Sequence, residues 1–166
     1  MTGLGLNLGP ILIAGGGIGG LALALALARS GLRSLVLERQ DKPTTAGAGI
    51  QLGPNAVRAL QVLGVADGVR ACVGEPEAIE VRVGGSGRCL ARLPLGGWIA
   101  ARHGAPYWVA HRGDLHGVLL AAVARDPLIE VRTGFEVASL AQTATQVSVA
   151  DAGGRGLAGP VLVGAD

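Results

Sequence analysis

The chain has 166 residues, of which 49% are hydrophobic, and a formal net charge of +2 at pH 7. This length suits one domain with a buried core. A charge so small and so scattered argues against nucleic acid or an anionic membrane surface as a partner. Cys72 and Cys89 form no C-x-x-C pair, so we expect neither a zinc site nor a disulfide and place the protein in the cytoplasm.

The start of the chain predicts a nucleotide-binding turn. An apolar run at 11–14 predicts a strand, Gly15, Gly17 and Gly20 follow with the G-x-G-x-x-G spacing, and 21–29 is a helix-forming run. The first glycine permits a sharp turn, the second lets a pyrophosphate approach the backbone, and the third lets helix and strand pack closely. The N–H groups at the start of the helix then face the phosphates.

A second apolar strand begins at Ser34 and ends in Glu38. A carboxylate at this distance from the glycine turn can accept both hydroxyls of an adenosine ribose. Strand, glycine turn, helix, strand and acid together favour dinucleotide binding. Two alternatives stay open: a glycine-rich turn that packs closely and binds nothing, and a plain solvated acid at the strand end.

The same apolar run raises the question of a membrane span. Residues 11–28 are uncharged, and about 18 apolar residues are the shortest stretch that crosses a bilayer. Glycines interrupt the first half of the run, and Pro10 and Gly31 bracket it as strand start and helix stop. A signal peptide would have basic residues before its apolar core, and none precedes Arg29. We therefore favour a βαβ unit of a water-soluble protein.

The rest of the chain predicts an α/β fold with an antiparallel excursion. A glycine-rich loop at 47–55 precedes a helix at 56–63, which Asn55 could cap, and period-two alternation at 78–93 predicts a hairpin. In order, we then expect a loop at 98–105, a strand at 107–110, a helix at 113–125, a strand at 129–133, a hairpin pair at 135–140 and 146–150, and a last strand at 160–164. A doubly wound sheet interrupted by a smaller sheet accounts for this order.

Four stretches together resemble the N-terminal half of the FAD-dependent aromatic hydroxylases, the para-hydroxybenzoate hydroxylase family. The stretches are 13–20, Leu37-Glu38-Arg39, 47–56 and 111–116. Residues 106–112 are most similar to the salicylate and 3-hydroxybenzoate 6-hydroxylase branch. The resemblance implies a Rossmann-like FAD-binding sheet over residues 1–166, with an inserted, substrate-side antiparallel β segment at about 74–110.

Carried over to matching positions, the resemblance implies FAD as cofactor and NAD(P)H as co-substrate. The implied cofactor-binding residues are Gly15, Gly17, Ile18, Gly19, Gly20, Glu38, Arg39, Ala48, Gln51, Arg112, Val137 and Asp166. The glycine turn would meet the pyrophosphate, Glu38 the adenosine ribose, and Arg39 and the backbone of Val137 the adenine. The loop at 47–52 would lie near the ribityl chain and isoalloxazine, touching through the Ala48 backbone.

The resemblance places the Arg112 guanidinium near the flavin phosphate or ribityl chain, and Asp166 in a Gly-Ala-Asp-Gly segment that contacts flavin or nicotinamide. Arg112 paired only with Asp114 at a helix start is the alternative. We interpret Tyr107 and Trp108 as packing residues. The three histidines have no metal-binding spacing, so we expect no metal and identify no catalytic base. They are His103, His111 and His116.

The family continues beyond the position of Asp166 with about as much sequence again, so the resemblance implies an incomplete family fold. We expect a portion of a monooxygenase that hydroxylates a small phenolic or aromatic-acid substrate with NAD(P)H and O2. The alternative is a non-catalytic remnant that binds nucleotide, or associates with another copy or the missing half through an unpaired sheet edge. A nicotinamide dehydrogenase domain is a third hypothesis, disfavoured by the loop at 47–51 and the antiparallel excursion.

Overall fold

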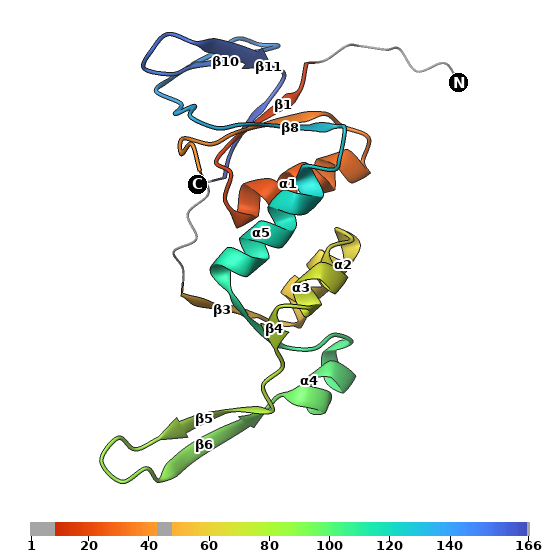
Figure 1. The fold of residues 1–166 in the computed structure, drawn as a ribbon, viewed down its shortest axis with the longest axis vertical. Coiled ribbons are helices and arrows are strands. Elements are labelled where there is room, and N and C mark those ends of the chain that lie inside the picture. The colour runs from red at the N-terminus through yellow and green to blue at the C-terminus, as the bar shows by residue number, and fades with distance from the viewer. Residues whose placement is uncertain (1–8, 43–47, 166) are drawn as a thin grey trace. The chain divides into compact units, whose positions relative to one another are not determined.

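The structure is a computed structural model, and it describes residues 9–42 and 48–165. The chain divides into two compact units (Figure 1). The first comprises residues 1–44 and 119–166, and the second comprises residues 45–118.

The described part of the first unit is built on a four-stranded parallel sheet with the order β12-β1-β2-β8. Its strands are β1 (Ile11–Ala14), β2 (Ser34–Leu37), β8 (Ile129–Arg132) and β12 (Leu162–Gly164). Helix α1 (Ile18–Arg29) connects β1 to β2. Because Ala14 is in register with Leu37, the residues that follow the two strands lie at the same edge of the sheet.

Both faces of this sheet are covered, which explains why its central strands are apolar without alternation. On one face, Ile13 and Val36 pack with Ala24 of α1. On the other, Leu12 and Leu35 pack against a three-stranded antiparallel sheet (Figure 1). That sheet consists of β9 (Ser139–Gln142), β10 (Val147–Ala150) and β11 (Gly156–Gly159).

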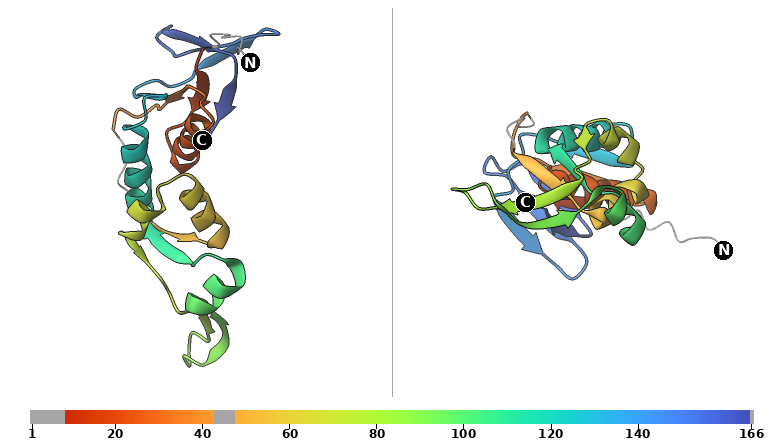
Figure 2. Two further views of the ribbon diagram at one scale, coloured as in Figure 1. Left: turned by 90° about the vertical axis from the view of Figure 1, so that its right-hand side faces the viewer. Right: turned by 90° about the horizontal axis from the view of Figure 1, so that it is seen from below.

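The second unit contains an antiparallel sheet with the order β3-β7-β4 and a two-stranded hairpin, β5-β6 (Figure 2). The strands are β3 (Gly49–Leu52), β4 (Val73–Gly74), β5 (Ala78–Arg82), β6 (Cys89–Pro94) and β7 (Trp108–His111). The helices are α2 (Pro54–Val62), α3 (Ala66–Arg70) and α4 (Gly96–His103). Helix α5 (Arg112–Val123) follows β7 and runs from the second unit into the first. Trp108 is 2% exposed, and its indole N–H donates to Glu75 Oε1 at 3.0 Å.

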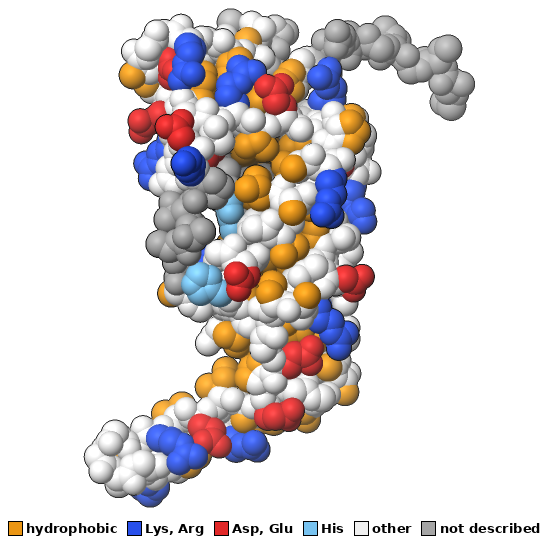
Figure 3. Space-filling model, in the orientation of Figure 1, with side chains coloured by type: hydrophobic (Ala, Val, Ile, Leu, Met, Phe, Trp, Pro, Cys, Tyr) orange, Lys and Arg blue, Asp and Glu red, His pale blue; other side chains and the backbone are white. Residues whose placement is uncertain are grey.

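The hairpin β5-β6 has one charged and one apolar face. Glu80 is paired with Arg82 on its own strand and with Arg92 on the facing strand. Figure 3 shows charged side chains on this hairpin. Ile79 and Leu93 face each other on the opposite side and remain 37% and 52% exposed. An isolated hairpin is marginally stable in water, so this apolar face is a surface that another element could cover.

Most expected elements are confirmed, but α3, β4 and β11 have no counterpart among them, the strand expected at 135–140 is β9 at Ser139–Gln142, and three further details are wrong. The segment expected to be a loop at 98–105 contains helix α4, which ends at Gly104. The glycine-rich loop at 47–55 contains strand β3. Asn55 does not cap the next helix, because α2 begins one residue earlier with Pro54 as its first residue and Gly53 as its N-cap.

The apolar run at 11–28 is divided between β1 and α1, and α1 has 12 residues. None of the helices in the described part of the chain could span a lipid bilayer.

Candidate functional site

The turn between β1 and α1 is shaped by two close backbone approaches. Gly15 has φ +119°, a backbone conformation that residues other than glycine rarely adopt. Its N–H donates to the Leu37 carbonyl at 2.8 Å. A Cβ at Gly20 would overlap the carbonyl oxygen of Gly15. The first turn of α1 therefore packs directly on the chain that leaves β1.

The start of α1 is open at its N-terminus. Gly17 is the N-cap, with extended φ/ψ values of −72° and −176°, and no described side chain caps the helix. A Cβ at Gly17 or Gly19 would meet nothing within 4 Å among the described residues. Because the first N–H groups of a helix have no intrahelical partner, those of Ile18 and Gly19 suit an anion at this position.

The Glu38 carboxylate turns toward this glycine turn. Its Oε2 accepts the N–H of Gly16 at 2.9 Å, and its Oε1 accepts the N–H of Gln40 at 2.9 Å. The backbone of Glu38 is held as well, since its N–H donates to the Arg132 carbonyl and its carbonyl accepts the N–H of Phe135. The side chain is thus half-buried and fixed at the sheet edge rather than extended into solvent.

Two other candidates of the first unit lie near this edge. Arg39 is exposed directly after Glu38. The Val137 side chain is half-buried and packs against the core cluster that contains Phe135, and none of the backbone hydrogen bonds among the described residues involves Val137. Asp166 lies outside the described residues.

The candidates of the second unit are exposed and lie just before β3, on β3 and at the start of α5. The Arg112 N–H donates to the Ala48 carbonyl at 3.2 Å, so these two residues are neighbours through their backbones. Gln51 Oε1 accepts the Tyr107 hydroxyl at 2.6 Å. The Arg112 guanidinium forms no ion pair with any described residue, Asp114 included.

The candidates thus form two groups, one in each unit. The glycine turn, Glu38, Arg39 and Val137 belong to the first unit, whereas Ala48, Gln51 and Arg112 belong to the second.

Sequence reasoning missed the residues that hold the candidates in place. The Gln40 N–H holds the Glu38 carboxylate, and the Phe135 N–H holds the Glu38 backbone. Tyr107 contacts Gln51. The contact of Tyr107 with Gln51 had no detectable signal, because it depends on β7 pairing with β3, a segment expected to be a loop. The contact of Phe135 with Glu38 had none, since it depends on β8 pairing with β2.

The described residues contain no group of three or more His, Cys, Asp or Glu side chains that could hold a metal ion. His111 Nδ1 accepts the N–H of Gly113 at 3.2 Å at the start of α5. The Cys72 thiol donates to the Val69 carbonyl at 3.1 Å. Burial, and then the negative charge of Asp114, raise the pKa of this thiol.

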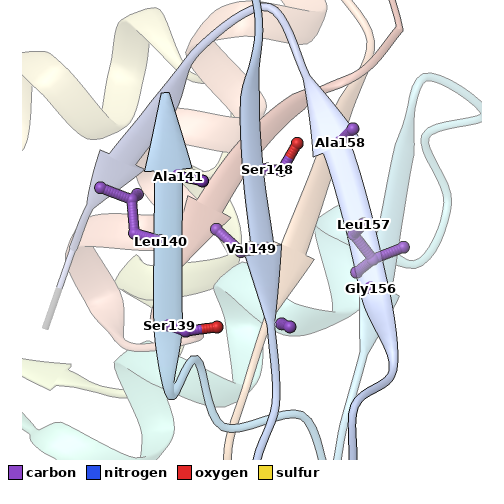
Figure 4. A pocket seen from close by; sticks show the side chains of 9 residues that line it. Ser139, Leu140, Ala141, Ser148, Val149, Gly156, Leu157 and Ala158 are labelled. Atoms are coloured by element: carbon purple, nitrogen blue, oxygen red, sulfur yellow. The ribbon is translucent and has the colours of Figure 1, made fainter. Parts of the chain in front are cut away.

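An open concavity lies on the β9-β10-β11 sheet (Figure 4). Small and aliphatic side chains line it, among them Ser139, Ser148 and Val149, and no charged side chain does. This lining suits neither a diphosphate nor proton transfer. The concavity is therefore not the candidate site.

The donor set at the glycine turn fits a dinucleotide cofactor. An uncapped helix start, an N-cap without a side chain and a carboxylate fixed beside them match the requirements of a diphosphate and its ribose.

Comparison with known proteins identifies the family of the chain. A family model described as FAD binding domain matches residues 9–166. The 3-hydroxybenzoate 6-hydroxylase 1 of Aquipseudomonas alcaligenes is 42% identical over 156 residues, which are 94% of this chain and 40% of that protein. The 3-amino-4-hydroxybenzoate 2-monooxygenase PtmB3 of Streptomyces platensis is 37% identical over 166 residues, 100% of this chain and 41% of that protein. The chain thus spans about 40% of the length of these curated relatives.

Solved structures give the same result. Klebsiella pneumoniae HpxO, solved with FAD and uric acid, is 28% identical with a TM-score of 0.81 over 92% of this chain and 38% of HpxO. The p-nitrophenol 4-monooxygenase PnpA of Pseudomonas putida DLL-E4 has a TM-score of 0.85 over 96% of this chain and 41% of its own, and at 22% identity it shows the fold alone. The chain therefore belongs to the FAD binding domain family, the family of the FAD-dependent aromatic-ring monooxygenases.

Proposed function

We propose that this chain is the FAD-binding portion of a flavin-dependent monooxygenase that hydroxylates a phenolic or aromatic-acid substrate with NAD(P)H and O2. The observation that carries the proposal is the Glu38 carboxylate fixed 2.9 Å from the Gly16 nitrogen, beside the open start of α1. FAD, when bound, supplies the electron-transfer and oxygen chemistry that side chains do not provide. The residues of the chain bind and orient it.

The glycine turn and Glu38 would hold the adenosine diphosphate half. The N–H groups of Gly17, Ile18 and Gly19 donate to phosphate oxygens, and the positive end of the helix dipole favours their charge. A carboxylate has about four lone-pair sites, and backbone N–H groups use one on each Glu38 oxygen. The remaining sites are available to the two ribose hydroxyls.

The other candidate residues would complete the cofactor site. Arg39 and the Val137 backbone are assigned to the adenine, and Ala48 and Gln51 to the ribityl and ring portion. Arg112, whose planar fork suits an oxyanion, is assigned to the phosphate or ribityl region. The full proposed set also contains Gly15, Gly20 and Asp166.

The substrate-side assignment rests on the second unit. Residues 74–110 include the β5-β6 hairpin and α4, and we assign them to the part of the protein that faces the aromatic substrate. NAD(P)H as the electron donor, a hydroxybenzoate-like substrate and a cytoplasmic location stay predictions. The names of the relatives, 3-hydroxybenzoate 6-hydroxylase among them, support the substrate class.

A second function is favoured by one observation. The exposed apolar side chains Ile79, Val81 and Leu93 of the hairpin are typical of a surface that associates. A non-catalytic chain that binds nucleotide and associates through such a surface is therefore the alternative.

The test titrates the purified chain with FAD and follows quenching of the flavin fluorescence. Saturable 1:1 binding that ADP competes away is expected, and its absence would overturn the proposal. Oxygen uptake and product formation are then measured with FAD, NADH or NADPH, and 3-hydroxybenzoate. FAD binding without oxygen uptake with any hydroxybenzoate would favour the non-catalytic alternative.

A further inference from the structure

The side chain of Arg155, just before β11, joins the turn at 151–155 to the segment at 134–135. Its Nε donates to Asp151 Oδ2, and its Nη2 donates to the carbonyl of Gly134. Its Cζ lies 5.5 Å from the centre of the Phe135 ring. The Arg155 backbone N–H also donates to Asp151 Oδ1 at 2.8 Å, so the arginine and the carboxylate are joined twice.

The segment that Arg155 contacts is the one that holds Glu38. The Phe135 N–H donates to the Glu38 carbonyl at 3.0 Å, and the Gly134 N–H donates to the Gln40 carbonyl at 3.4 Å. Phe135 is 2% exposed and belongs to the core cluster below the sheet. A displacement of the 134–135 backbone would therefore move the two peptide carbonyls that follow the Glu38 side chain, those of Glu38 and Gln40.

The arginine is well exposed, whereas its partner is not. The Arg155 side chain is 62% exposed and that of Asp151 only 7%. Burial raises the pKa of the Asp151 carboxyl, but the hydrogen bonds and charge of Arg155 outweigh burial and leave the pKa below its ordinary value. Ion pairs with an exposed partner typically add no more than about 1 kcal/mol to folding stability.

We propose that Arg155 is a positioning residue for the adenosine half of the cofactor. Anchored on Asp151, it fixes Gly134 and Phe135, and these fix the backbone that aims the Glu38 carboxylate at the glycine turn. The inference rests on the proposed function, because it requires that Glu38 bind the ribose.

The experiment is a double-mutant cycle on the full chain, with ADP as the probe and isothermal titration calorimetry as the measurement. The variants are Arg155→Ala, Glu38→Ala, their combination, and Arg82→Ala as the matched control. Arg82 also donates twice to a carboxylate and once to a turn carbonyl, and it is 57% exposed, but it lies on the hairpin of the other unit.

Arg155→Ala is expected to raise the Kd for ADP about fivefold with Glu38 present and less than about twofold in the Glu38→Ala background. Arg82→Ala should leave the Kd for ADP unchanged. An equal effect of Arg155→Ala in both backgrounds would show that the arginine does not act through Glu38 and would overturn the inference. Should Arg155→Ala not fold, Arg155→Lys keeps the charge but loses the fork, and the same background-dependent rise, about twofold, is required of it.

The titration of the wild-type chain distinguishes failure of the proposed function from failure of this inference. A wild-type chain that binds neither ADP nor FAD overturns the proposed function, and this inference with it. Wild-type binding that Arg155→Ala leaves unchanged overturns this inference alone.

Discussion

The carboxylate of Glu38, at the end of β2, accepts the backbone N–H of Gly16, in the turn after β1, over 2.9 Å. A Cβ at Gly16 would lie 2.9 Å from the same oxygen, so the carboxylate occupies the space that a side chain would need. The absence of a side chain at this position lets the acid come close to the turn. The acid and the backbone that we propose to bind the diphosphate are thereby held together.

Replacing Glu38 by glutamine tests the role of this charge. Glu38→Gln keeps an oxygen that can accept the Gly16 N–H but removes the negative charge that strengthens hydrogen bonds to ribose hydroxyls. We expect the Kd for FAD to rise about tenfold, while the free energy of unfolding without FAD falls by no more than about 1 kcal/mol, because the amide nitrogen cannot accept the exposed Gln40 N–H that Oε1 accepts. Equal FAD affinity of the variant and the wild type would contradict a ribose-binding carboxylate.

Two glycines of the turn are expected to respond differently to the same added methyl group. Gly20→Ala places a Cβ on the backbone of Gly15, which cannot move aside, and should lower the free energy of unfolding by about 1–3 kcal/mol. Gly17→Ala meets open space with an ordinary φ, so its stability should change by less than about 0.5 kcal/mol.

For FAD binding by the folded variants, we expect the opposite order, with the larger effect at Gly17. If a diphosphate lies against Gly17, the methyl group of Gly17→Ala occupies its place, and the Kd for FAD should rise at least about tenfold. Urea denaturation and FAD titration of both variants check the pair of expectations. Unchanged FAD affinity of the Gly17→Ala variant would contradict the proposal that the pyrophosphate binds at this turn.

The sheet of the first unit could be predicted from the sequence because its signals are local. The apolar runs around Ile13 and Val36, the glycine spacing and the acid after β2 each lie within a few residues of what they determine. Helix α4 was not predicted from the sequence, because Gly96 and Gly97 are poor helix formers. Within the helix, Trp98 stacks under Arg102 at 5.6 Å, and the Gly96 N–H donates to the Pro76 carbonyl.

The supports of the candidate site could not be predicted for a related reason. The contacts of Phe135 with Glu38 and of Arg155 with Gly134 join segments far apart in the chain. They exist only because β8 pairs with β2 and the β9-β10-β11 sheet packs against the parallel sheet. No local pattern at Arg155 indicates this environment.

The ion pair of Asp151 and Arg155 makes a prediction about acid stability. The pKa of Asp151 is lowered in the folded chain, against burial, by its bonds to Arg155, so this carboxylate stabilises the fold when ionised. That contribution is complete above the unfolded-state pKa of about 3.9 and is lost as pH falls through the lower folded value. The difference in unfolding free energy between wild type and Arg155→Ala should be constant from pH 7 to about pH 5 and shrink toward pH 3. Urea denaturation across this range measures it, and a difference that grows on acidification would contradict the assignment.

The thiol of Cys72 should be a slow nucleophile near neutral pH. Burial first, and then the charge of Asp114, raise its pKa, and only the thiolate reacts with alkylating reagents. In a Cys89→Ser chain, the rate of alkylation by iodoacetamide should reach half of its maximum above the pH of about 8.5 that is usual for cysteine. Asp114→Asn should lower this midpoint, because it removes the neighbouring charge. The control Asp67→Asn removes an exposed carboxylate that does not contribute to the shift and should leave the midpoint where it was. A midpoint that Asp114→Asn does not move would show that burial alone protects the thiol.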